Sequence, residues 1–123
     1  MKRNLTLIFA LSVMLSGCSS SKKQLERGNY DVAISEAVKQ LRKNPNDSKQ
    51  ITTLERSYAI VNEQDLERIR FLKMEGRPQN YDEIYQIYKR LNDRQSLVRT
   101  VLPLRSGGRT IEFPFTDYLQ EMI

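Results

Sequence analysis

The chain has 123 residues, a formal net charge of +5, 28% charged residues and 39% hydrophobic residues, which fit one small, mostly helical domain. It contains no histidine and a single cysteine, Cys18, which excludes a disulfide framework, Ser-His or Cys-His nucleophile chemistry and zinc sites of the usual kind. The positive charge is too mild to indicate nucleic-acid binding, and the Asp and Glu residues have the helix-surface spacing that is typical of solvated charges.

Residues 1–17 have the three parts of a secretory signal peptide. Lys2 and Arg3 are basic, and the apolar run 5–15 that follows them is too short to span a bilayer comfortably. Two small residues then precede Cys18. The alternative interpretation is an ordinary signal peptide, or a short anchor helix, with an incidental cysteine.

The segment from Leu15 to Cys18 resembles a bacterial lipobox. The resemblance implies that the Cys18 thiol is acylated, that residues 1–17 are removed and that the new amino terminus is acylated as well. Two or three acyl chains anchor a protein stably to a membrane. Ser19, and the lack of an acid in residues 19–23, resemble the lipoproteins that Gram-negative bacteria send to the periplasmic face of the outer membrane.

Residues 18–27 are predicted to form a short, lipidated polar tether, and residues 28–93 a helical domain. Apolar residues recur at helical spacing from Tyr30 to Leu41, which predicts an amphipathic helix. Pro45 is expected to follow the end of this helix, because proline cannot continue one.

This block resembles the second helix of a tetratricopeptide repeat, which Gly-x-Tyr-x-x-Ala opens and Pro-Asn closes. The resemblance implies that Gly28 forms a tight turn between helices, that Tyr30 fills the groove between paired helices and that Ala33 lets them approach closely. Pro45 would end one repeat and start the next. Arrays of such repeats bind other proteins along a concave groove.

One long helix of about 42 Å is predicted from Ser48 to Glu75, because this stretch contains neither Gly nor Pro. Its polar run, Asn62 to Asp65, is a candidate for a bend. An ordinary repeat would turn at this point, so the sequence departs from the roughly 34-residue period of the family.

The segment from Gly76 to Pro78 is predicted to end the long helix. Residues 80–84 then echo the start of the first helix, with Tyr81 and Ile84 at the positions of its tyrosine and its alanine. The larger Ile84 predicts wider packing. Core packing with hydroxyls at the rim is favoured over a ligand-stacking surface for the apolar stripe that follows. The predicted stripe comprises Tyr81, Ile84, Tyr85, Tyr88 and Leu91.

Residues 94–115 are predicted to form a β-hairpin that turns at Gly107-Gly108. The prolines of this segment lack an N–H group for the ladder, so both strands are expected to resemble edge strands. Because Arg105 and Arg109 flank the glycines, an anion-binding cradle is the alternative interpretation of the turn.

Residues 116–123 resemble a helix start, with Asp117 as the cap and Gln120 three residues later. So short a helix does not hold alone in water, and its apolar residues need a partner. We therefore expect a helix that continues in a longer protein. The alternative is a frayed terminal helix on a complete one.

The predicted fold is all-α: a tetratricopeptide-like helical array with a long central helix and a small β-hairpin. We expect a membrane-anchored lipoprotein of the cell envelope that serves as a scaffold or adaptor for other envelope proteins. The alternative is a lipoprotein that binds or processes cell-wall glycan or peptide, because mild basicity suits anionic wall polymers. The sequence predicts no enzyme, no cofactor, no metal site and no nucleic-acid partner.

Overall fold

A computed structural model describes residues 20–123. The chain is mostly helical and carries a small antiparallel hairpin near its C-terminus, as predicted. The tetratricopeptide-like arrangement of the helices stays a prediction. The elements are α2 (Ser20–Glu26), α3 (Tyr30–Lys43), α4 (Ser48–Glu75), α5 (Asn80–Arg99), β1 (Leu104–Ser106), β2 (Arg109–Ile111) and α6 (Tyr118–Glu121).

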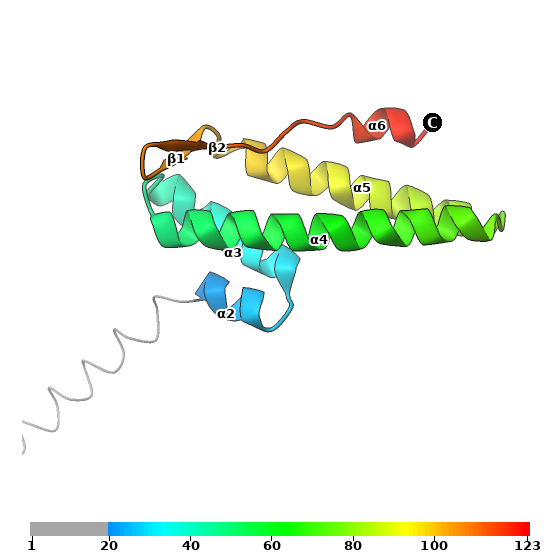
Figure 1. The fold of residues 1–123 in the computed structure, drawn as a ribbon, viewed down its shortest axis with the longest axis horizontal. Coiled ribbons are helices and arrows are strands. Elements are labelled where there is room, and N and C mark those ends of the chain that lie inside the picture. Colours follow the sequence, from blue (N-terminus) through cyan, green and yellow to red (C-terminus); the bar gives the residue numbers. More distant parts are fainter. Residues whose placement is uncertain (1–19) are drawn as a thin grey trace, which may run out of the picture.

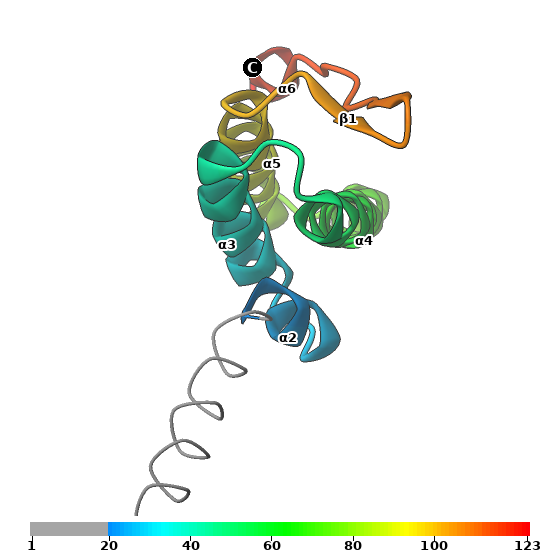
Figure 2. The ribbon, with the colours of Figure 1, turned by 90° about the vertical axis from the view of Figure 1, so that its left-hand side faces the viewer.

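Helices α3, α4 and α5 form a bundle in which consecutive helices run in opposite directions (Figures 1 and 2). Helix α4 has 28 residues and is therefore about 42 Å long, whereas α3 has 14 residues and covers only one half of it. Helix α2 lies on one side of this bundle, and the hairpin and α6 lie on the opposite side.

The predicted long helix is confirmed, and local signals set both of its ends. The Asp47 side chain caps the start by accepting a hydrogen bond from the Gln50 backbone N–H at 3.3 Å. Gly76 ends the helix in the left-handed conformation, with a φ of 65°, which glycine adopts without a steric penalty. Pro45 lies in the short turn between α3 and α4, as expected. Helix α4 continues through its polar run, in which Asn62 and Asp65 accept hydrogen bonds from Arg94 of α5 and Glu63 and Gln64 face solvent.

Two apolar clusters divide the interior along α4. The first core joins α3, the first half of α4, the end of α5 and the hairpin, and the second joins the rest of α4 and α5 to α6. The buried residues of the first core are Ile34, Ala37, Val38, Leu41, Ile51, Leu54, Val61, Val98, Leu104 and Ile111. Those of the second core are Ile69, Leu72, Ile84, Ile87, Tyr88, Leu91 and Tyr118.

The hairpin is shorter than the predicted one. Leu104 pairs with Ile111 at its open end. Gly107 and Gly108 form the turn with φ angles of 59° and 76°, because a two-residue hairpin turn of this kind requires a positive φ at both positions. Residues 94–99 were predicted to belong to the hairpin, but they continue α5. The reason is that their buried side chains extend the helical stripe of α5 onto the first core.

The predicted tether is also partly wrong, because most of it is helical. Residues 20–26 form α2, whose Ser21 and Leu25 are buried against the neighbouring helices α3 and α4. The spacing of four residues between these two side chains places them on one helical face. The polar composition of this segment concealed that short apolar face.

Helix α6 exists as predicted, but the Asp117 side chain forms no cap hydrogen bond. The side chain of Gln95, on α5, positions the chain before α6 instead. Its Nε2 donates to the Thr116 carbonyl at 2.8 Å, and its Oε1 accepts from the Thr116 N–H at 2.9 Å. The two bonds satisfy a buried amide and place Tyr118 against the second core.

Candidate functional site

The predicted lipidation site, Cys18, lies outside the described residues. Gly28 turns the chain between α2 and α3 with a φ of 79°. Ala33 is 0% exposed, in agreement with its expected place at a helix–helix contact, and Tyr30 is half-buried against the first core. These residues shape the α2–α3 junction and have structural roles.

The predicted stripe of α5 is partly wrong. Ile84, Tyr88 and Leu91 are buried as expected, but Tyr81 is 69% exposed and Tyr85 is 46% exposed. The cause is the short α3, which packs on the first core and does not reach the start of α5, where, among the described elements, only α4 and the short α6 contact the helix. The two exposed tyrosines are one helical turn apart and therefore form one surface.

These tyrosines line a groove of about 320 Å³ between α5, the end of α4 and α6. We call it the tyrosine groove, and its lining includes Lys73, Tyr81, Ile84, Tyr85, Tyr88 and Met122. On its floor, Tyr88 packs on Tyr118 with ring centroids 6.4 Å apart. Lys73 Nζ donates to the Tyr88 hydroxyl at 3.1 Å and fixes that ring further.

A buried ionic cluster lies between the two cores, next to the tyrosine groove along α5. Arg94 is its centre, with a side chain that is 2% exposed. Its Nε and Nη2 donate to the two carboxylate oxygens of Asp31 at 2.7 and 3.1 Å. Its Nη1 donates to Asn62 Oδ1 at 2.8 Å, and Nη2 also donates to Asp65 Oδ2 at 2.9 Å. One arginine therefore joins α3, α4 and α5.

Four of the five N–H groups of the Arg94 side chain donate hydrogen bonds within the cluster. Burial lowers the pKa of Arg94, but the hydrogen bonds to Asp31 and Asp65 outweigh burial and hold that pKa above its ordinary value. The arginine therefore stays charged, and its bonds stay within the protein. We assign the cluster a structural role, because each guanidinium nitrogen of Arg94 donates to a protein acceptor and the side chain is buried.

The acidic residues were interpreted as solvated charges. This interpretation is wrong for Asp65, which is buried, and Asp31 is exposed but also forms an ion pair with Arg94. A signal for the cluster is present in the sequence. Arg94 lies between Leu91 and Val98 in the apolar stripe of α5, at the spacing of a buried residue. An arginine at such a position needs a buried acid.

The alternative interpretation of the hairpin turn was an anion-binding cradle flanked by Arg105 and Arg109, and the contact of Arg109 argues against it. Arg109 Nη2 lies 3.4 Å from Glu55 Oε1, which directs this arginine towards α4. The pair ties the hairpin to the bundle at an exposed position, where such a contact contributes about 0–1 kcal/mol.

Within residues 20–123, no cluster of three or more His, Cys, Asp or Glu side chains is arranged to hold a metal ion. None of the helices in this part of the chain has the length and apolar character needed to cross a membrane. Comparison of the chain with family models, curated proteins and solved structures returns no match.

Proposed function

We propose that the chain is a lipoprotein of the cell envelope, anchored through Cys18, that binds another protein in the tyrosine groove. The observation that supports the binding role is the exposure of Tyr81 and Tyr85 beside the buried side chains of Ile84 and Tyr88. The proposal also retains the tetratricopeptide-like helical domain predicted for residues 28–93.

The chemistry of the groove suits a protein partner. Tyrosines are enriched among the residues that dominate protein interfaces, since they bury a large ring and keep a hydroxyl for a hydrogen bond. Ile84 and Met122 add apolar surface to the groove. A volume of about 320 Å³ accommodates one or two large side chains of a partner.

The position of the groove fits an anchored adaptor. Helix α2 is joined to the anchor segment and lies beside the first half of α4, whereas the groove lies at the far end of α4 and on the opposite side of the bundle (Figure 1). An α4 of about 42 Å therefore acts as a spacer that holds the groove away from the membrane.

Substitution of Cys18→Ser is expected to leave an unprocessed, unlipidated precursor, because the thiol is the acylation site. The measurement is detergent partitioning of the wild-type and mutant proteins, together with the mass of each. A mutant that is processed and partitions as the wild type does would show that the lipobox interpretation is wrong.

A photo-cross-linking residue placed at Tyr85 is expected to yield a discrete protein adduct in intact cells, because this side chain lies in the groove. The matched control places the same residue at Gln86, which is exposed but points about 100° away on α5. Adding Tyr81→Ser should lower the Tyr85 adduct at least fivefold, since an interface tyrosine contributes about 1 kcal/mol or more.

Equal adducts at both positions would contradict a specific groove. An adduct that muramidase digestion removes, and protease digestion does not, would assign the groove to cell-wall glycan instead. Tyrosine faces also stack on sugars, so this outcome distinguishes the two functions that the sequence left open.

A further inference from the structure

A second groove lies between α2 and the first turns of α4, on the side of the molecule opposite the hairpin. Its volume is about 450 Å³. Its lining includes Ser21, Lys22, Lys49, Gln50, Thr53 and Arg56. We call it the basic groove, because three of its nine described lining residues are cationic and none is acidic.

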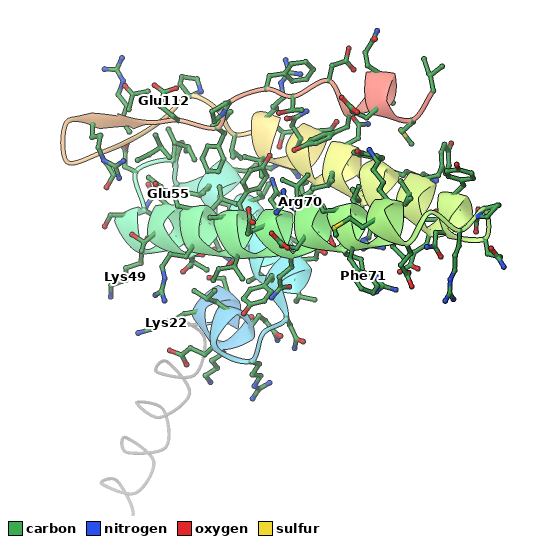
Figure 3. All side chains as sticks on the ribbon, turned by 45° about the vertical axis from the view of Figure 1, so that its right-hand side comes forward. Lys22, Lys49, Glu55, Arg70, Phe71 and Glu112 are labelled. Carbon is green, nitrogen blue, oxygen red and sulfur yellow. The ribbon has the colours of Figure 1, made fainter. Side chains whose placement is uncertain are left out.

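The cations of the basic groove are available to a ligand. Within residues 20–123, none of Lys22, Lys49 and Arg56 lies within ion-pair distance of an acidic side chain. Figure 3 shows Lys22 on α2 and Lys49 on α4 projecting from the same side of the molecule. Positive charge therefore gathers there from two separate helices.

The floor of the basic groove is ordered. The Ser21 hydroxyl donates to Gln50 Oε1 at 2.6 Å, which joins α2 to α4 across the groove, and Thr53 is buried beside it. Because this contact fixes the position of α2, Lys22 stays close to the cations of α4. The groove is thus a defined surface between two packed helices.

The sign of the charge changes along this face of α4. Lys49 and Arg56 are seven residues apart and lie on one helical face, and the same face continues to Glu63 and Glu67. These two acids bind Arg70. The start of α4 therefore favours an anionic surface, and the middle of α4, about 10 Å further on, does not.

The basic groove is also the part of the described structure closest to the proposed anchor. Cys18 precedes the first residue of α2 by two positions, which span at most about 7 Å of chain. A membrane that holds the acyl chains would lie within reach of Lys22. We propose that the basic groove binds the phosphate headgroups of anionic phospholipids in the membrane to which the protein is anchored.

This inference rests on the proposed anchoring at Cys18 for its location, but its chemistry is tested separately. Each Lys or Arg at an anionic membrane surface strengthens binding by about fivefold. Lys49→Gln combined with Arg56→Gln should therefore weaken headgroup binding by about 30-fold. Both side chains are exposed, so the variant should fold as the wild type does.

The experiment titrates the full chain, purified in a neutral detergent, with short-chain phosphatidylglycerol, and follows the backbone NMR signals of α2 and α4. Lys39→Gln combined with Lys89→Gln is the matched control, since it removes the same charge from exposed sites outside the groove. We expect saturable shifts around Lys22, Lys49 and Arg56 that persist in the control and are lost in the groove variant.

Further arms identify the source of the phosphate. Short-chain phosphatidylcholine should bind weakly, because its headgroup carries no net charge. Inorganic phosphate that binds as tightly as phosphatidylglycerol would reveal a small-anion site and overturn the proposal. Equal weakening in both variants, or binding to purified peptidoglycan but not to phosphatidylglycerol, would also overturn it. Binding that survives Cys18→Ser would uphold the basic groove even where the anchor proposal fails.

Discussion

Replacement of Arg94 by methionine is expected to lower the free energy of unfolding by about 3–5 kcal/mol. Methionine fills much of the volume of arginine, so the loss comes from the partners and not from a cavity. Asp65 Oδ2 and Asn62 Oδ1 would remain between the two cores without the donors that satisfy them now, and among the described residues Asp65 would keep only the half-exposed Arg90 as its partner. Removing one partner of a buried ion pair is strongly destabilising, because the remaining charge is left poorly compensated.

Arg90→Met provides the matched control for this prediction. Arg90 binds the other carboxylate oxygen of Asp65 at 3.1 Å, but its side chain is 53% exposed. Its loss should therefore lower the free energy of unfolding by about 1 kcal/mol or less. Urea denaturation monitored by circular dichroism measures both variants.

A compensated variant tests the cause of the loss. Arg94→Met with Asp65→Leu and Asn62→Leu removes the buried partners as well, and it should recover most of the lost stability because apolar replacements of buried ion pairs are often neutral. Asp31 can stay, since its side chain is 57% exposed and water can replace its partner. An Arg94→Met protein within about 1 kcal/mol of the wild type would contradict the role assigned to the cluster.

Substitution of Ala33→Glu is expected to lower the free energy of unfolding by several kcal/mol, on the order of the cost of burying an unpaired charge. Ala33 is 0% exposed on a helix that packs against both α2 and α4. The larger side chain must therefore push neighbouring helices apart as well as bring a carboxylate into their contact.

The adjacent residue supplies the control for Ala33. Val32 is 48% exposed, so Val32→Glu adds the same charge at the preceding position of α3 without burying it. Its effect should stay within about 0.5 kcal/mol. Thermal and urea unfolding measure the stability of both proteins. An unchanged melting temperature for Ala33→Glu would contradict the burial of Ala33 at a helix–helix contact.

The ionic cluster also bears on the proposed function. It fixes α5 to α3 and α4 at the point where the first core ends, and the tyrosine groove begins at Tyr88, less than two turns towards the start of the same helix. Loss of the cluster should therefore loosen the groove while the anchor end keeps its core. A rigid groove matters for binding, because ordering a loose surface lowers affinity.

The helix ends and the turn of the hairpin could be predicted from the sequence. Pro45, Gly76 and the pair Gly107-Gly108 act through their own backbone geometry, which depends on residues within a turn or two. The long α4 was predicted for the same reason. Burial of Ala33 followed from its place in an amphipathic pattern.

The pairing of distant side chains required the packed structure. Arg94 meets Asp31 across 63 residues and Asp65 across 29 residues, and no local pattern states which acid a buried arginine will reach. The exposure of Tyr81 has a similar cause. Local spacing shows which face of α5 is apolar, but the length of α3 decides how much of that face is covered. Helical period is a property of one segment, whereas burial depends on where the neighbouring helices end.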